Sequence, residues 1–312
     1  MNEHELAILR QFCLDAEPAS CTPYGCGHIN RTYLVATAGG RCYILQKINH
    51  HTFRDVAGLM ENIELVTEHL RRKSPDPRSV LTLIRTKDGK SYLEADDGYW
   101  RVFRFVEDSI CLQQPESDAD FYESAVGFGT FQQLLSDFPA EKLHETIPNF
   151  HNTPDRYRAF HETLTRDPMH RAAQVQPEIE FALARQAEMA ALQNALDAGE
   201  LPLRVTHNDT KLNNVLFDAK TRRALCIIDL DTVMPGSALY DYGDSIRFGA
   251  ATAAEDEREL DKMEMSLERF RVFTRGYVRA CPGLTQKELE LLPLGAKVMT
   301  MECGVRFLTD HI

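Results

Sequence analysis

Short runs of apolar residues, several alternating with polar ones, dominate the first hundred positions and are typical of β-strands. These runs lie at residues 33–35, 42–48, 80–85 and 99–106. Asp88-Gly89 and Asp97-Gly98 stand between the later runs. Asp-Gly between apolar runs favours a β-hairpin, because both residues tolerate the positive φ of its turn. The pattern predicts a small, mostly antiparallel sheet.

A different pattern predicts helices, one within this sheet and several after it. Apolar residues from Asp55 to Leu70 recur every three or four positions, which is the helical period. Beyond Glu107 this period is clearest at residues 121–135, 178–196, 260–279 and 286–306. We expect the last helix to break near Pro293, because proline lacks an N–H donor. The change of pattern predicts an α+β fold with a β-rich domain, residues 1–107, and a mainly helical domain, residues 108–312.

Composition and charge narrow the class of protein. The chain has 312 residues, 43% hydrophobic and 26% charged, as in ordinary globular proteins. Its net charge of −12 argues against nucleic acid or an anionic membrane as the main partner. No run of about 18 apolar residues is present to span a membrane. The eight cysteines form no CxxC pair and no zinc-like spacing, which indicates reduced thiols. We therefore expect a cytoplasmic monomer with no nucleic acid or membrane partner.

Candidate chemistry gathers between Val205 and Asp244. The segment VTHNDTKLNNVLF places Asp209 and Asn214 in a polar loop between apolar strands, and a second apolar strand then leads to Asp229. This set suits phosphoryl transfer to a hydroxyl. One carboxylate orients the hydroxyl and accepts its proton, while an amide oxygen and a second carboxylate hold Mg²⁺ on the nucleotide phosphates. The alternative is a polar turn between strands, where Asp and Asn are also common.

The form of these segments resembles a known fold. HxDxxxxN followed by IDxD is similar to the catalytic and metal loops of the protein-kinase-like fold. HNDTKLNNVLF, IIDLDTVMPG and DYGDSIRFGA resemble the aminoglycoside-phosphotransferase superfamily, and within it the N-acetylhexosamine 1-kinases. Further similar segments cover most of the chain: GCGHINRTYLV, YILQKIN, GLMENI, YWRVFRFVED and ECGVRFLTD. The resemblance implies a two-lobed, protein-kinase-like fold.

The resemblance also implies a role for each residue of the two loops. Asp209 would orient and deprotonate the acceptor hydroxyl, and Lys211 would neutralise charge that develops on the transferring phosphate. Asn214 and Asp229 would ligate Mg²⁺, with Asp231 as a further metal candidate. Three other residues would fix the loops rather than take part in the chemistry: His207, Asp241 and Asp244.

The β-rich lobe is expected to bind ATP. Gly25 and Gly27 precede a predicted strand, where their backbone amides could approach the phosphates. The resemblance implies that the backbone where the strand at 99–106 passes into the linker meets the adenine, at Phe105, Val106 and Glu107.

A cation that positions the phosphates is expected on the strand YILQKIN. Lys47 is the cation in this segment. Gln46 is the alternative for the position that faces the phosphates, because adjacent residues of a strand face opposite ways. An acidic partner would come from the helix predicted at 55–70. Glu61 is favoured there over two alternatives, Glu64 and Glu68.

The resemblance places the acceptor next to Asp209. His28 and Asn30 would reach the acceptor from the glycine loop, and Arg306 from the C-terminal helix. The reaction it implies is ATP- and Mg²⁺-dependent phosphorylation of the anomeric 1-hydroxyl of an N-acetylhexosamine, GlcNAc or GalNAc, by direct in-line transfer. Two alternatives stay open: a kinase of another small metabolite, such as choline, homoserine or an aminoglycoside, and a pseudokinase that binds nucleotide without turnover.

Overall fold

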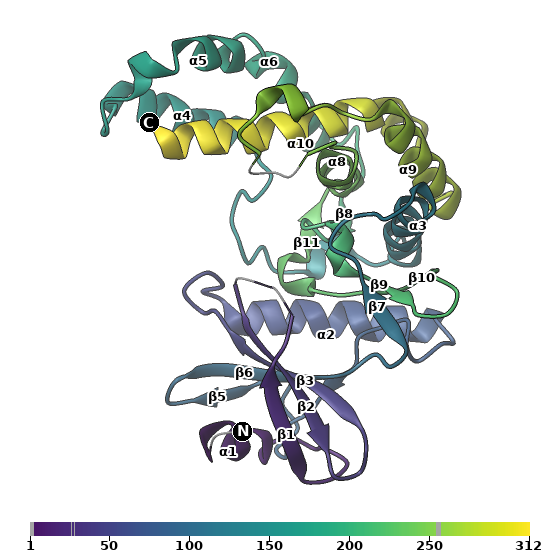
Figure 1. The fold of residues 1–312 in the computed structure, drawn as a ribbon. Coiled ribbons are helices and arrows are strands. Elements are labelled where there is room, and N and C mark those ends of the chain that lie inside the picture. Colours follow the sequence, from purple (N-terminus) through teal and green to yellow (C-terminus); the bar gives the residue numbers. More distant parts are fainter. Residues whose placement is uncertain (1–2, 26, 28, 254–256) are drawn as a thin grey trace.

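A sheet lobe and a helical lobe make up the molecule (Figure 1). This computed structural model describes residues 3–25, 27, 29–253 and 257–312. The sheet lobe contains the N-terminus, and the C-terminal helix lies across the far side of the helical lobe. The α+β, two-lobed prediction is confirmed.

The sheet lobe is built on antiparallel strands in the order β1-β2-β3-β6-β4, with β5 paired to β6. Its strands are β1 (Pro18–Pro23), β2 (Arg31–Thr37), β3 (Cys42–Ile48), β4 (Leu83–Ile84), β5 (Leu93–Ala95) and β6 (Gly98–Arg104). In the β3–β6 register, Gln46 pairs with Arg101 and Lys47 pairs with Trp100. This register decides which side chains share a face of the sheet.

Two helices cover opposite faces of this sheet. Helix α1 (Glu3–Leu9) packs Ile8 and Leu9 into one core with Trp100 and Val102 of β6. Helix α2 (Val56–Lys73) buries its apolar stripe in another core that contains Phe103. Arg101 and Phe103 therefore face α2, while Trp100 and Val102 face α1, as strand alternation requires. Figure 1 shows α2 between the sheet and the helical lobe.

The helical lobe has eight α-helices among its described residues. They are α3 (Asp118–Leu134), α4 (Thr153–Arg166), α5 (Gln176–Leu183), α6 (Gln186–Met189), α7 (Ala191–Asp197), α8 (Ala238–Gly249), α9 (Leu267–Ala280) and α10 (Gln286–His311). The single helix predicted at 178–196 is thus three short ones. The breaks let Ile179, Met189 and Leu192 all enter the same core, which one straight helix would present on different faces.

Helix α10 runs without interruption through Pro293, so the predicted break there is wrong. Pro293 is on the exposed face of the helix, where water can bond the carbonyl that loses its N–H partner. On the buried face, Gly295 packs against the backbone of Leu239 in α8. The helix also begins with a capping box between Thr285 and Glu288. Tertiary packing and the cap therefore offset the local cost of the proline.

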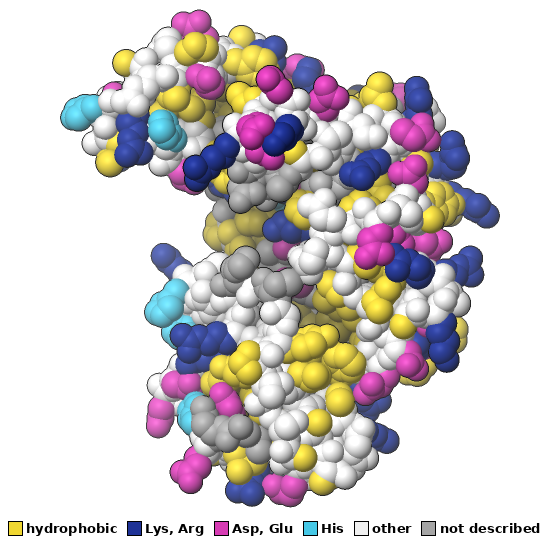
Figure 2. All heavy atoms as spheres, viewed as in Figure 1, with side chains coloured by type: hydrophobic (Ala, Val, Ile, Leu, Met, Phe, Trp, Pro, Cys, Tyr) yellow, Lys and Arg dark blue, Asp and Glu magenta, His cyan; other side chains and the backbone are white. Residues whose placement is uncertain are grey.

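Two small sheets hold the polar loops between the lobes. Strand β8 (Arg204–Thr206) pairs with β11 (Met234–Gly236). Strand β9 (Val215–Asp218) pairs with both β7 (Ser109–Cys111) and β10 (Ala224–Ile227). The surface is hollowed where the two lobes meet (Figure 2). Across the part of the chain that the structure describes, no helix has the length and apolar character needed to cross a membrane.

Candidate active site

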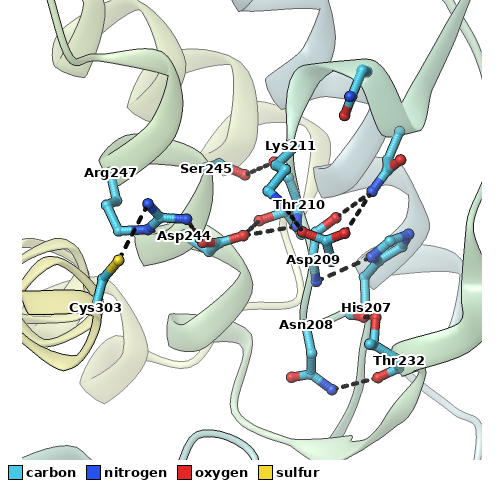
Figure 3. Close-up of polar contacts among 12 residues, drawn as sticks. His207, Asn208, Asp209, Thr210, Lys211, Thr232, Asp244, Ser245, Arg247 and Cys303 are labelled. Carbon is cyan, nitrogen blue, oxygen red and sulfur yellow. Dashed lines mark hydrogen bonds and ion pairs between the residues drawn. The ribbon is translucent and has the colours of Figure 1, made fainter. Parts of the chain in front are cut away.

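Asp209 lies at the centre of a compact polar cluster on the loop after β8 (Figure 3). Lys211 places Nζ 3.2 Å from Oδ1 of Asp209. Asn214 donates from Nδ2 to Oδ2 of Asp209 at 3.2 Å and to the Asp209 carbonyl at 2.8 Å. The structure thus brings together three residues that the sequence analysis placed in one site. The Asn214 nitrogen is bound to Asp209, and no described residue donates a hydrogen bond to the amide oxygen, which could therefore serve a cation.

His207 braces this loop from within the core. Its side chain is fully buried and lies edge-on between the rings of Phe128 and Phe131. Nε2 bonds the carbonyl of Ile228 at 2.9 Å, and Nδ1 accepts from the Asp209 N–H at 3.3 Å. These two bonds require the neutral tautomer with its proton on Nε2. The predicted bracing role follows from this geometry, since one imidazole joins two loops.

Two buried aspartates on α8 hold the loop by its backbone. Asp241 accepts from the N–H groups of His207 and Asn208 at 2.9 and 2.8 Å. Asp244 accepts from the N–H of Thr210 at 2.9 Å. Burial raises the pKa of Asp241, although these N–H groups favour its charged form. The prediction that both residues fix loops through backbone bonds is confirmed.

Asp229 enters the site from the loop after β10. Its backbone adopts the left-handed region, with φ 59°, a conformation that aspartate tolerates better than most residues. Loss of hydration, together with the carboxylates of Asp231 and Asp209, raises the pKa of Asp229 to about 6. Part of the residue is exposed to solvent, but the protein packed around its carboxylate limits hydration there. No described residue donates a hydrogen bond to its carboxylate.

This donor set fits a Mg²⁺ ion shared with a nucleotide. Asn214 and Asp229 offer only oxygen atoms, which Mg²⁺ prefers, and the mutual repulsion that raises the pKa of Asp229 would be relieved by a cation. Among the described residues, no group of three or more His, Cys, Asp or Glu side chains is arranged to hold a metal alone. That agrees with Mg²⁺ sites in which phosphates and water complete the coordination.

Asp231 is placed differently from the expectation that it ligates metal. Its Oδ1 lies 2.6 Å from Nη1 of Arg101, and both side chains are buried. Its Oδ2 accepts from Nδ2 of Asn30 at 2.6 Å. Both carboxylate oxygens therefore contact the sheet lobe, Oδ1 through an ion pair and Oδ2 through a hydrogen bond. Asn30, expected to contact substrate, is also engaged at Oδ1, which accepts from the N–H of Asn49 at 2.9 Å.

Lys47 does not face the cleft, which corrects the predicted phosphate contact. Its Nζ lies 2.6 Å from Oδ2 of Asp97 and 5.4 Å from the centre of the Trp100 ring. These partners lie on the α1 side of the sheet. The side chain of Gln46 lies on the face of the sheet that α2 covers, where its Oε1 accepts a hydrogen bond from Nε of Arg101 at 3.0 Å. Adjacent residues of a strand face opposite ways, which is why Gln46 was the alternative to Lys47. In the structure Gln46, and not Lys47, lies on the cleft side of the sheet.

The acidic partner predicted on α2 is likewise engaged elsewhere. Glu61 lies 2.7 Å from Nε2 of His144 in an exposed contact. Glu64 and Glu68 both pair with Arg85. The helix therefore presents none of these carboxylates to β3. At this point α2 presents Met60 instead, whose sulfur lies 3.9 Å from Nη1 of Arg101.

The glycine loop and the linker meet at one edge of the cleft. Gly25 has φ 78°, which a side chain would strain, and nothing lies within 4 Å of a Cβ at Gly25 or Gly27. The ring of Tyr24 packs edge-on against Phe105, with centroids 6.0 Å apart. Val106 is buried. Contacts of a nucleotide with this loop and linker stay a prediction.

Two further residues, His28 and Arg306, were predicted to contact the acceptor. His28 lies outside the described residues. Arg306 is exposed on α10, with Nη2 3.9 Å from the sulfur of Cys303. The same sulfur lies 3.8 Å from Nη1 of Arg247, which pairs with Asp244 (Figure 3). Arg306 therefore lies on the helix that packs behind the Asp209 loop, and its contact with an acceptor stays a prediction.

Sequence reasoning missed two groups that support the site. Arg101 is buried on β6, and only the β3–β6 register reveals that it faces the cleft. His151 bonds Glu302 at 3.0 Å and the Asn208 carbonyl at 3.2 Å. Local sequence does not reveal either role, because each contact joins residues more than fifty positions apart.

One chain thus combines a two-lobed, kinase-like fold with a polar cluster around Asp209. The family model described as "Phosphotransferase enzyme family" (APH) matches residues 20–272. The chain belongs to this family and is a phosphotransferase of the small-molecule kinase type.

Solved structures of other proteins share this two-lobed fold. The GDP complex of wild-type aminoglycoside 2'-phosphotransferase-IIIa is 15% identical, with a TM-score of 0.61 over 98% of this chain and 90% of that one. Amicoumacin kinase hAmiN, in complex with AMP-PNP, Ca²⁺ and Ami, is 13% identical, with a TM-score of 0.60 over 100% and 87%. A microcompartment-associated aminopropanol kinase is 16% identical, with a TM-score of 0.50 over 99% and 96%. At these identities the likeness concerns the fold.

Proposed function

We propose that this phosphotransferase uses ATP and Mg²⁺ to phosphorylate the anomeric 1-hydroxyl of an N-acetylhexosamine. The observation that carries the kinase chemistry is the contact of Asp209 with both Lys211 and Asn214, next to Asp229. The sugar assignment rests on the form of HNDTKLNNVLF, IIDLDTVMPG and DYGDSIRFGA, which is similar to that of N-acetylhexosamine 1-kinases.

The proposed reaction is a direct displacement. The carboxylate of Asp209 would accept a hydrogen bond from the 1-hydroxyl and then its proton, as the sugar oxygen bonds to the γ-phosphorus and the bond to the β,γ-bridging oxygen breaks. Lys211 would offset negative charge that develops on the transferring group. Asn214 and Asp229 would hold Mg²⁺, which when bound neutralises charge on the nucleotide phosphates. ADP and the sugar 1-phosphate would leave.

The structural neighbours favour one alternative acceptor. One of them is named as an aminoglycoside 2'-phosphotransferase and another as an amicoumacin kinase. A cationic aminoglycoside would use the same Asp209 chemistry on a different hydroxyl. The two functions would share the transfer step and differ only in the acceptor.

The test is ADP release from Mg·ATP with a panel of acceptors: GlcNAc, GalNAc, glucose, choline, homoserine and kanamycin. Turnover that depends on GlcNAc or GalNAc, with loss of the sugar's reducing end, would support the proposal. Reducing-end loss is specific because it reports a phosphate on C1. Turnover only with kanamycin or another acceptor would mean that this acceptor, and not an N-acetylhexosamine, is the substrate. Nucleotide binding without turnover on any acceptor would favour a pseudokinase.

A further inference from the structure

The cleft side of the sheet carries a buried ion pair in place of the expected one. Lys47 pairs with Asp97 and Glu61 with His144, so neither expected partner reaches the cleft. Arg101 fills the vacant position, in register with Gln46 and 2.6 Å from Asp231. Its side chain is 1% exposed. A buried guanidinium is costly unless it is paired and hydrogen-bonded, so this arrangement calls for an explanation.

The surroundings of Arg101 place it where phosphates must lie. Asp231 is two residues from Asp229, and the charge of Arg101 opposes the rise in the pKa of Asp229. Asp231 also accepts from Asn30, at the end of the glycine loop. The guanidinium therefore lies between the end of the loop expected over the phosphates and the carboxylate expected to hold Mg²⁺.

The charge balance of the cleft points the same way. Asp209, Asp229 and Asp231 bring three carboxylates to the site, and a nucleotide adds several negative charges. Cations are needed to hold such a ligand. Nε of Arg101 is bound to Gln46 and Nη1 is paired with Asp231. No described residue accepts a hydrogen bond from Nη2, so the forked guanidinium can serve a phosphate while it stays paired.

We propose that Arg101, rather than a lysine on β3, positions the nucleotide phosphates, and that Asp231 orients Arg101 instead of ligating the metal. The inference rests on the proposed kinase function and adds a phosphate contact to it. The cation that positions the phosphates is then on β6, whereas the sequence analysis predicted it on β3. It also limits the metal ligands from the protein to Asn214 and Asp229.

The test measures nucleotide binding in the absence of any acceptor, with Mg·AMP-PNP and adenosine as the two probes in calorimetry. Arg101→Met alone would leave Asp231 buried and unpaired, which destabilises a fold strongly. The main variant is therefore Arg101→Met/Asp231→Asn, which removes both charges, and its melting temperature is checked alongside. Arg101→Lys keeps the charge but loses the fork, and Lys47→Met is the matched control on the other face of the sheet.

We expect the double variant to bind Mg·AMP-PNP about 10- to 100-fold more weakly, the range for loss of a charge-assisted hydrogen bond. Adenosine, which has no phosphate, should bind within about twofold of the wild-type value. Lys47→Met should stay within about threefold of wild type for Mg·AMP-PNP, because Lys47 lies on the other face of the sheet. Asp231→Asn alone should weaken Mg·AMP-PNP binding by the same factor at every Mg²⁺ concentration, since it removes the partner that orients Arg101 and no metal ligand. Arg101→Lys should fall between the wild type and the double variant.

Three results would overturn the proposal. Wild-type affinity for Mg·AMP-PNP in the double variant would mean that Arg101 only neutralises Asp231. Equal losses for adenosine and Mg·AMP-PNP would mean that the pair merely shapes the pocket. A Mg²⁺-dependent loss in Asp231→Asn alone would make Asp231 a metal ligand. Failure of the wild type to bind Mg·AMP-PNP is a distinct result, which would reject the kinase function itself.

Discussion

His207 joins the loop of Asp209 to the loop of Asp229 through one hydrogen bond, from its Nε2 to the carbonyl of Ile228 at 2.9 Å. Ile228 directly precedes Asp229, and the other ring nitrogen accepts from the N–H of Asp209. One neutral, fully buried imidazole therefore sets the spacing between the residue expected to bind the acceptor and the residue expected to bind metal. Such positioning is the main contribution that a protein makes to phosphoryl transfer.

Asp209→Asn should lower turnover by about 10²–10⁴-fold, the usual contribution of a general base. The amide keeps the size of the side chain and can still accept from Asn214, but it cannot take up the proton. Binding of Mg·AMP-PNP should remain within a few-fold of wild type. Steady-state ADP release and calorimetry measure the two effects. Turnover within a few-fold of wild type would remove Asp209 from its catalytic role.

Asp229→Asn should raise the Mg²⁺ concentration needed for half-maximal nucleotide binding by tenfold or more, an effect of about 1.4 kcal/mol. The reason is the loss of one of the two oxygen ligands that the protein is expected to offer. A Mg²⁺ titration at fixed AMP-PNP measures this shift, and Lys47→Met is the control. An unchanged titration would show that Asp229 does not hold the metal.

The same variant should change stability in a pH-dependent way. The folded-state pKa of Asp229 is about 6, above its ordinary value of 3.8, so the fold is destabilised as the carboxyl ionises. Wild type should therefore lose stability relative to Asp229→Asn as pH rises from about 4 to 6, and the gap should persist above 6. Melting curves without nucleotide or Mg²⁺ test this. A constant gap from pH 4 to 8 would contradict the prediction.

Local sequence is enough to predict which residues of the catalytic loop come together, but not which residues from other elements surround them. Asp209, Lys211 and Asn214 lie within six positions, so spacing alone brings them together. Arg101 and Asp231 are 130 positions apart, and their pairing depends on the β3–β6 register and on how the lobes meet. Sequence alternation could say that Lys47 and Gln46 face opposite ways, but not which of them faces α2.

Helix boundaries show the same limit. The capping box of Thr285 and Glu288 marks the start of α10 in the sequence. The passage of this helix through Pro293 is visible only in three dimensions, because it depends on the exposed position of the proline and on close packing with α8. Propensity therefore predicted the start of the helix correctly and its interior wrongly.

Two glycines of α10 offer a matched test of this packing. A Cβ at Gly295 would lie 2.7 Å from the backbone oxygen of Leu239, whereas nothing lies within 4 Å of one at Gly304. Gly295→Ala should cost about 1–3 kcal/mol of unfolding free energy, because backbone atoms must move. Gly304→Ala should stabilise by about 0.5–1 kcal/mol, since alanine is the better helix former. Urea unfolding measures both, and equal effects would contradict the close α8–α10 contact.

His151 gives the site a dependence on pH that can be tested through stability. Its ring is buried between Glu302 and the carbonyl of Asn208, the residue before Asp209. Burial alone would lower the pKa of His151, but the Glu302 carboxylate raises it above the ordinary value of 6.5. A raised histidine pKa stabilises the fold fully below 6.5, and that stabilisation is lost as pH rises through the folded-state value.

The comparison variant is His151→Gln, whose amide can still donate to Asn208 but cannot be charged. Wild type should exceed this variant in melting temperature most at pH 5.5–6.5, and the difference should shrink by pH 9. Glu302→Gln in the wild-type background should move the decline to lower pH, since it removes the group that raises the His151 pKa. Parallel melting profiles for wild type and His151→Gln would show that the imidazole acts only through its shape. A declining difference would show that its charge secures the backbone beside Asp209.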